Sequence, residues 1–381
     1  MTDQKLLVSI IFQDHKQIGH DIEYNICVGK AAESMGISHT VILPKIWKGD
    51  PLIPENWLPL LNTGKGRFRG HLTQIINKTV MTARSLQAII NERILSTRRD
   101  VIFFIESFTL SYLISFYLAM YLLRSKKLKL VILIRWNIIQ DKRGFFLKHL
   151  MKKIIASHGE GSLTLVTDSD LIQEAIQEHM KVPCTVLPIP HTEICYTKEN
   201  AIATCKKNEH IVCWWPGIPR RIKGLGVIAK LLREKSEYAS RFKIVAAKSS
   251  HLTRTAGGAE LELLDDYIER SAYQQQLIRS DIILTPYDKI YSHGTSGIFV
   301  EAVVAGKMPF TTEGTWMAYE LGRFGLDQLV LDWSKKNIME TMYHRYEDLT
   351  IREKLESMSY SYRNKHNLTN FSEALERVIG V

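Results

Sequence analysis

The sequence predicts an α/β protein with two domains, each built on a parallel sheet. Apolar strand segments alternate with helical segments in both halves of the chain, which is the pattern of parallel βαβ units. The chain has 381 residues, whereas a single hydrophobic core stops growing at about 250–300 residues. A polar, lysine-bearing stretch at residues 191–208 suits a linker. We therefore expect a first domain over residues 1–195, a second over residues 196–365 and a final segment over residues 366–381.

The first half opens as a strand, a helix and a second strand. Residues 6–12 are a continuous apolar run, as in a buried parallel strand. Apolar residues then recur at helical spacing over residues 22–35, and residues 40–44 form the next strand. Gly19 lies in the loop after the first strand. Because open α/β sheets bind ligands at the carboxyl ends of their strands, we expect the Gly19 loop at the ligand-binding edge.

An uncharged stretch over residues 108–123 lies between two apolar strands, residues 100–105 and 130–134. Its sixteen residues are fewer than the roughly 20 that a membrane-spanning helix needs. We therefore expect a buried helix here, with a helix pressed onto a membrane surface as the alternative. The earlier residues 45–69 contain several prolines and are expected to be irregular.

A basic amphipathic segment follows the strand at residues 130–134. Its basic residues are Lys142, Arg143, Lys148, Lys152 and Lys153, and its apolar residues are Phe145, Phe146, Leu147 and Leu150. This pattern is typical of a helix at an anionic membrane surface. It is equally typical of a core-facing helix with a basic outer face, and the sequence favours neither interpretation.

The charge and composition of the chain limit the kinds of molecule that it is expected to bind. The formal net charge is +10, and residues 1–190 carry 24 Lys and Arg against 16 Asp and Glu. A basic half suits an anionic membrane surface, a phosphorylated glycan or nucleic acid, or is simply a solvated surface. No nucleic-acid-binding motif is present, so we expect no nucleic acid. The histidines lack metal-ligand spacing, and five cysteines without a CxxC pair indicate a reduced, cytoplasmic protein without a secretory signal.

The second half repeats the α/β pattern and carries the chemistry in two loops. Strands are expected at residues 210–215, 242–247, 281–285 and 308–312. The loop after the first of these strands contains Gly217, Arg220, Arg221 and Lys223. The loop after the third contains His293, Gly294, Thr295, Ser296 and Gly297 and leads into a helix over residues 298–305.

These two loops have the composition of an anion site. Both are expected at the carboxyl edge of one sheet, where the free N–H groups of a helix start attract negative charge. Arginine and lysine side chains beside them would suit a diphosphate. Glu301, one turn into the helix, is placed to accept hydrogen bonds from sugar hydroxyls. The alternatives are a solvated arginine loop and an ordinary turn, with a carboxylate near a helix start.

The same two loops resemble the retaining glycosyltransferases of the family-4 type, which have the GT-B fold. That family carries a G-R…K-G loop and then two glutamates separated by seven residues, followed by an A-x-G-x-P-V-like turn. The matching residues here are Gly217, Lys223, Gly224, Glu301, Ala302, Ala305, Gly306 and Pro309. The resemblance implies two Rossmann-like domains facing a cleft, with a C-terminal helix that crosses back to the first domain.

The resemblance also implies roles for individual residues. Lys223 would hold the diphosphate of a UDP- or GDP-linked sugar, and Glu301 its ribose. The sugar nucleotide is a substrate, so no cofactor and no metal are implied. The implied catalytic residues are Lys223, Arg220 and His293, and the implied donor-binding residues are Gly19, Gly217, Arg221, Gly294, Thr295, Ser296, Gly297 and Glu301.

The sequence departs from the family pattern at three positions. Ile218 follows Gly217, so the loop arginine is Arg220 or Arg221. His293 stands where the first glutamate is expected. Arg135 occupies the end of a first-domain strand where the family often has a histidine.

Two functions follow as hypotheses. The first is a cytoplasmic, metal-independent, retaining glycosyltransferase that acts on a glycan or lipid-linked acceptor of the cell envelope, peripheral on the inner face of the membrane. The second is a catalytically degenerate GT-B scaffold that binds a polyanion or a partner protein.

Overall fold

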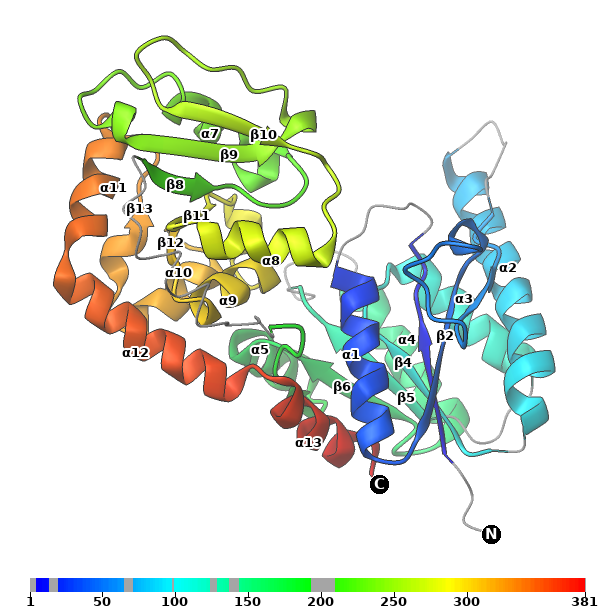
Figure 1. Cartoon of the computed structure of the whole chain (residues 1–381). Coiled ribbons are helices and arrows are strands. Elements are labelled where there is room, and N and C mark those ends of the chain that lie inside the picture. Colours follow the sequence, from blue (N-terminus) through cyan, green and yellow to red (C-terminus); the bar gives the residue numbers. More distant parts are fainter. Residues whose placement is uncertain are drawn as a thin grey trace. The chain divides into compact units, whose positions relative to one another are not determined.

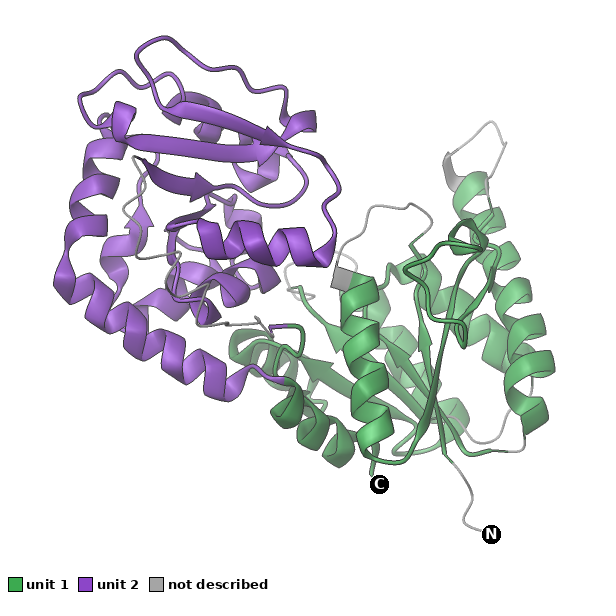
Figure 2. Cartoon of the chain, viewed as in Figure 1, with its two compact units in different colours: residues 1–191, 368–381 green, residues 192–367 purple. Residues whose placement is uncertain are grey.

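The computed structural model describes residues 5–13, 20–64, 71–97, 99–123, 129–136, 144–192 and 210–380. The chain divides into two compact units (Figure 2). The first comprises residues 1–191 and 368–381, and the second residues 192–367. Each is an α/β unit with one parallel sheet, which confirms the predicted pair of Rossmann-like domains (Figure 1).

The first unit contains a seven-stranded parallel sheet in the order β3-β2-β1-β4-β5-β6-β7. Its strands are β1 (Leu6–Ile10), β2 (Ser38–Pro44), β3 (Leu58–Leu61), β4 (Val101–Ile105), β5 (Lys129–Ile134), β6 (Leu163–Thr167) and β7 (Cys184–Val186). The central strands are mostly apolar because both faces of the sheet are covered by helices. One expectation was wrong: the proline-bearing stretch expected to be irregular contains the edge strand β3.

Helices cover both faces of this sheet. They are α1 (His20–Ser34), α2 (His71–Ile89), α3 (Leu110–Leu122), α4 (Gly144–His158), α5 (Asp170–Met180) and α13 (Leu368–Ile379). On one face, apolar side chains of α2, α3, α4 and α5 form the larger core. On the other face, α1 and α13 pack together over residues such as Phe104 and Val131.

The uncharged stretch of the first half is a buried helix, as predicted. It forms α3, in which Leu113 and Phe116 are completely buried against α2 and the sheet. Within the described ranges, no helix has both the length and the apolar character needed to cross a membrane.

The second unit contains a six-stranded parallel sheet in the order β10-β9-β8-β11-β12-β13. Its strands are β8 (Ile211–Trp214), β9 (Phe242–Ala247), β10 (Glu260–Leu264), β11 (Ile282–Thr285), β12 (Met308–Thr312) and β13 (Val330–Leu331). Its helices are α7 (Leu225–Leu231), α8 (Arg270–Arg279), α9 (Gly297–Val304), α10 (Trp316–Gly322), α11 (Ile338–Glu347) and α12 (Leu349–Lys365). The strands β8 and β11 are neighbours, so the loops that follow them lie side by side.

The C-terminal helix returns to the first unit, as predicted. In α13, Phe371 packs edge-on against Tyr24 of α1 with ring centroids 5.6 Å apart. The ammonium group of Lys5 donates to the carbonyl of Gly380 at 2.9 Å, and Lys129 donates to the carbonyl of Ile379. Lysines at a helix C-terminus stabilise it because the last carbonyls lack partners within the helix.

Candidate anion site of the second unit

The two loops singled out in the sequence are fastened to each other. The loop after β8 and the loop after β11 share a backbone hydrogen bond, in which the N–H of Asp288 donates to the carbonyl of Ile222 at 2.9 Å. The indole of Trp215 donates to the carbonyl of Lys223 at 3.0 Å. These bonds fix the position of the backbone at Lys223, so the side chain of this residue extends from a fixed point at the carboxyl edge of the sheet.

Gly224 allows the two loops to approach this closely. Its φ angle is +91°, in the left-handed region that L residues rarely adopt. A Cβ atom at this position would lie 2.4 Å from both Cγ and the carbonyl oxygen of Pro286. Glycine is therefore required here by backbone conformation and by space.

The ammonium group of Lys223 and the side chain of Ile298, in the first turn of α9, both approach Gly217. A Cβ atom built on Gly217 would be 3.4 Å from Nζ of Lys223 and 3.4 Å from Cδ1 of Ile298. Nζ of Lys223 also lies 5.6 Å from the ring centroid of Tyr287. Burial lowers the pKa of Lys223, and the neighbouring Tyr291 opposes that effect. A partly desolvated ammonium of this kind gains more from an anionic ligand than an exposed one does.

The start of α9 supplies backbone donors. Ser296 caps the helix, and its hydroxyl accepts a hydrogen bond from the N–H of Phe299 at 3.3 Å. His293 lies just upstream, with its Nδ1 2.9 Å from the hydroxyl of Ser292. The amides of the first turn of a helix have no partners within the helix and carry partial positive charge. Lys223 and the start of α9 thus bring two sources of positive potential to one place.

The other predicted site residues of the second unit lie in the same two loops and at the start of α9. Arg220 is exposed, and its charge contributes to lowering the pKa of Lys223. Arg221 is also exposed. Gly294, Thr295 and Gly297 belong to the turn and first residue of α9. Gly19 lies outside the described residues. The roles assigned to all of these residues stay predictions.

Glu301 is the residue whose surroundings differ most from the expectation. Its side chain is only 1% exposed. Oε1 forms an ion pair with Arg270 at 2.6 Å, and Oε2 accepts a hydrogen bond from the hydroxyl of Tyr273 at 2.7 Å. Each oxygen of the carboxylate thus already has one partner on α8.

Sequence reasoning missed Arg270 and Tyr273. Both lie on α8, about thirty residues before Glu301, and reach it only through the packing of α8 on α9. No spacing rule links the two helices. The weak available signal was the position of Arg270 at the start of a helix that follows a strand, which places it at the carboxyl edge of the sheet.

The carboxyl edge of the first unit carries a buried ion cluster. Arg135 follows β5, and it contacts Glu106 after β4 at 2.5 Å and Asp168 after β6 at 2.8 Å. Its guanidinium lies 4.4 Å from the ring centroid of Tyr24. Burial disfavours the charge on Arg135, but the two carboxylates outweigh that effect and raise its pKa. Burial raises the pKa of Glu106, and Arg135 opposes that shift.

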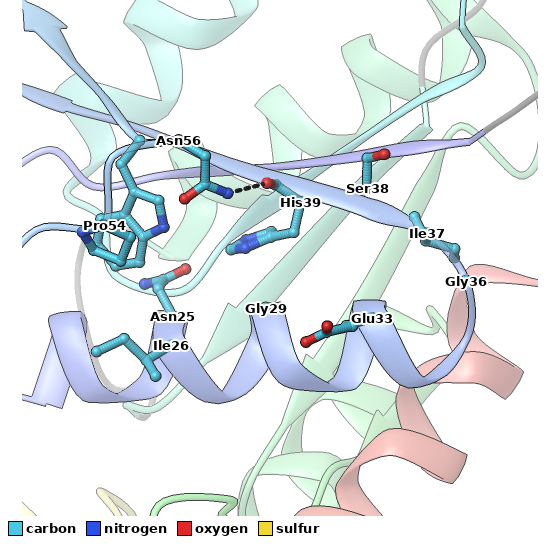
Figure 3. Close-up of a pocket in the computed structure, with 11 residues that line it drawn as sticks. Asn25, Ile26, Gly29, Glu33, Gly36, Ile37, Ser38, His39, Pro54 and Asn56 are labelled. Atoms are coloured by element: carbon cyan, nitrogen blue, oxygen red, sulfur yellow. Dashed lines mark hydrogen bonds between the residues drawn. The ribbon is translucent and has the colours of Figure 1, made fainter.

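A separate cavity of about 550 Å³ lies beside α1 in the first unit (Figure 3). Asn25 and Gly29 of α1 face His39 of β2, and the Asn56 amide donates to the carbonyl of His39 at 2.9 Å. Burial lowers the pKa of His39 to about 4, and its Nε2 lies 2.9 Å from the hydroxyl of Ser9. Glu33 adds a carboxylate to the wall. The volume is within the range of small-molecule sites.

Among the residues with a described placement, no group of three or more His, Cys, Asp or Glu side chains could hold a metal ion.

Comparison with proteins of known structure identifies the fold. No protein-family model matches the sequence, and no curated protein sequence matches it. Among solved structures, sucrose-phosphate synthase from Thermosynechococcus elongatus matches with a TM-score of 0.68 and 10% identity, over 99% of this chain and 98% of that chain. WaaG, a glycosyltransferase involved in lipopolysaccharide biosynthesis, matches with a TM-score of 0.60 and 13% identity, over 98% of this chain and 100% of that chain. The chain has the GT-B glycosyltransferase fold.

The GT-B fold is also present in an enzyme that is not a transferase. A UDP-N-acetylglucosamine 2-epimerase matches over 100% of this chain and 95% of that chain, with a TM-score of 0.61 and 13% identity. At such identities the likeness shows the fold alone, and the reaction has to be argued from the site.

Proposed function

We propose that the protein is a glycosyltransferase that moves a sugar from a UDP- or GDP-linked donor to a glycan or lipid-linked acceptor of the cell envelope, with retention of configuration and without a metal. The second unit would bind the donor and the first unit the acceptor. Departure of a nucleoside diphosphate requires stabilisation of its developing negative charge, which Lys223, Arg220 and the start of α9 would supply. His293 would lie beside the transferred sugar.

One observation carries this proposal: the ammonium group of Lys223 and the side chain of Ile298, in the first turn of α9, both approach Gly217. Within the part of the chain that the structure describes, the charged and titratable groups that influence the pKa of Lys223 are Tyr291 and Arg220, and neither is a carboxylate. A partly buried ammonium in such surroundings is costly unless it serves a ligand. The neighbouring rings of Tyr287 and Tyr291, with centroids 4.9 Å apart, offer aromatic surface rather than an opposite charge. An anionic ligand would supply the counter-charge.

Calorimetric titration with UDP, GDP and their common sugar conjugates tests the proposal directly. We expect binding in the micromolar to millimolar range, and at least a tenfold loss with Lys223→Ala, because a charge-assisted contact contributes about 1.5–3 kcal/mol. Lys336→Ala, at an exposed lysine of the same unit, is the matched control. Absence of nucleotide and sugar-nucleotide binding at millimolar concentrations would reject the function.

An anionic membrane surface is the further partner that we propose. On α4, Phe145 and Phe146 are 76% and 60% exposed, and Lys152 and Lys153 are exposed two turns later on the same side of the helix. The opposite side of α4, which includes Leu147 and Ile154, is buried. Outward aromatic side chains beside lysines suit the headgroup region of an anionic bilayer.

The degenerate scaffold remains the second candidate because two features weaken a catalytic interpretation. His293 replaces the first glutamate of the family pattern, and the carboxylate of Glu301 is held by Arg270 and Tyr273. Hydrolysis or transfer from any donor, measured as release of UDP or GDP and lost in Lys223→Ala, would exclude this candidate. Nucleotide binding without any turnover would favour it.

A further inference from the structure

The contacts of Glu301 determine which group a ligand meets beside α9. The carboxylate is 1% exposed, whereas the side chain of Arg270, which pairs with it, is 28% exposed. A molecule that approaches from solvent therefore meets the side chain of Arg270 before it reaches the carboxylate of Glu301. The charge presented at this point of the site is positive.

Packing holds the guanidinium of Arg270 in one orientation. It lies 5.2 Å from the ring centroid of Tyr273 and pairs with Oε1 of Glu301 at 2.6 Å. Tyr273 is itself fixed by its hydrogen bond to Oε2 of Glu301 and by edge-on packing against Trp214 of β8, with ring centroids 4.9 Å apart. The four side chains form one packed group, in which Glu301 is the acceptor for both Arg270 and Tyr273.

One helix links this group to the Lys223 loop. Ile298, which approaches Gly217 as the ammonium of Lys223 does, and Glu301, which pairs with Arg270, are three residues apart on α9. Residues at that spacing are neighbours on a helix surface. Lys223 and Arg270 thus lie toward two neighbouring residues of α9, Ile298 in its first turn and Glu301 in its middle.

We propose that Arg270 is a further ligand-binding cation of the donor site, in addition to Lys223 and Arg220, and that Glu301 is a positioning residue that orients it. The site then recognises the diphosphate through these three cations, and Glu301 does not contact the ribose hydroxyls. This inference rests on the proposed function, since it needs a nucleoside diphosphate as the ligand. It assigns the selectivity for a diphosphate over a monophosphate to Arg270.

Binding of three ligands by the full chain tests this assignment. They are whichever of UDP and GDP binds more tightly, the corresponding monophosphate and the corresponding 2′-deoxy diphosphate. For the wild type, we expect the 2′-deoxy diphosphate to bind within about threefold of the ribonucleotide and the monophosphate to bind at least tenfold more weakly, since it forgoes one charge-assisted contact. Arg270→Ala should reduce diphosphate affinity at least tenfold and leave monophosphate affinity nearly unchanged.

Two more variants separate positioning from folding. Glu301→Gln should lower the diphosphate-to-monophosphate affinity ratio in the same direction as Arg270→Ala, a readout that a purely structural defect would not change selectively. Arg279→Ala is the matched control, because Arg279 lies on the same helix and pairs with Glu262 at an exposed position. Should Arg270→Ala fail to fold, Arg270→Gln keeps a donor for Glu301 and answers the same question.

Specific outcomes would overturn the inference. Wild-type affinity that falls tenfold or more on removal of the 2′-hydroxyl, with Glu301→Gln abolishing that difference, would show that Glu301 contacts the ribose. That result would leave the proposed glycosyltransferase function in place. An unchanged diphosphate-to-monophosphate ratio in folded Arg270→Ala would also reject the role of Arg270. Failure of every nucleotide to bind the wild type would reject the function and the inference together.

Discussion

Gly224 lies so close to Pro286 that a Cβ atom on the glycine would be 2.4 Å from the proline ring and from its carbonyl oxygen. This contact joins the loops after β8 and β11, which carry Lys223 and lead to α9. The site therefore depends on a position that contacts no ligand in our proposal, and its disruption should separate the loops without altering any charged group.

Gly224→Ala should reduce both stability and nucleotide affinity. The alanine would adopt a positive φ angle, at a cost of about 1–3 kcal/mol, and the loops would have to move apart. We expect a lower midpoint of thermal unfolding and at least tenfold weaker nucleotide binding by calorimetry. Gly226→Ala is the control, because Gly226 lies inside α7 and a Cβ atom added there would meet no other atom within 4 Å, and alanine favours a helix. Equal behaviour of the two variants would contradict the requirement for glycine at residue 224.

Replacement of Phe145 and Phe146 by serine should abolish binding to anionic vesicles while the fold is kept. Their side chains are exposed on α4, so their loss removes apolar contact with lipid without opening the core. Flotation with vesicles of phosphatidylcholine and phosphatidylglycerol measures the effect, and raised salt should weaken wild-type binding. Tyr360→Ser, at an exposed aromatic residue of the second unit, serves as the control. Equal flotation of wild type and the double variant would refute the membrane surface.

Removal of the Glu106 carboxylate should destabilise the first unit strongly. Glu106→Ala leaves the half-buried guanidinium of Arg135 with one of its two carboxylate partners. It also removes the carboxylate that accepts a hydrogen bond from the amide of Asn25 at 3.0 Å. We expect a loss of about 3 kcal/mol in the free energy of unfolding, measured with urea. Asp265→Ala removes an exposed pair with Lys248 and should have a much smaller effect, because solvent screens such pairs. A similarly small effect for Glu106→Ala would show that the cluster contributes little.

Stability should fall as the pH drops from about 6.5 to about 4, in part because of His39. Burial lowers its pKa from 6.5 to about 4. Below pH 6.5, His39 therefore becomes protonated in the unfolded chain but stays neutral in the native state. The native state therefore loses stability through this interval, by on the order of 3 kcal/mol at its end. His39→Gln should reduce the pH dependence of the unfolding midpoint, whereas His179→Gln, at an exposed histidine on α5, should not. Parallel pH profiles for wild type and His39→Gln would exclude this contribution.

The sequence indicated the central strands better than the edges of the sheets. Strands β4, β5 and β11 are short runs of apolar residues because helices cover both of their faces. The edge strands β3 and β10 were missed. Pro59 in β3 and the glutamates of β10 contradict a central strand, but an edge strand pairs on one side only and tolerates both.

In the candidate site, too, the sequence indicated some residues and not others. Lys223, Gly224 and the start of α9 could be found because each loop has a local pattern of glycines and cations next to a strand. The partners of Glu301 could not be found, since Arg270 and Tyr273 reach it only through the packing of α8 against α9. The pairing of Arg135 with Glu106 and Asp168 likewise depends on the order of β4, β5 and β6 in the sheet, which local sequence does not specify.

The helix α13 is synthesised after the whole second unit but belongs to the first. Residues 192–367 emerge from the ribosome before it, so the second unit has its complete sequence available while the first still lacks a helix. Until residues 368–379 follow, Tyr24 and Leu187 lack the cover that Phe371 and Leu375 give them. The first unit is therefore translated first but completed last. A nascent chain halted before α13 would expose this apolar surface to chaperones and proteases.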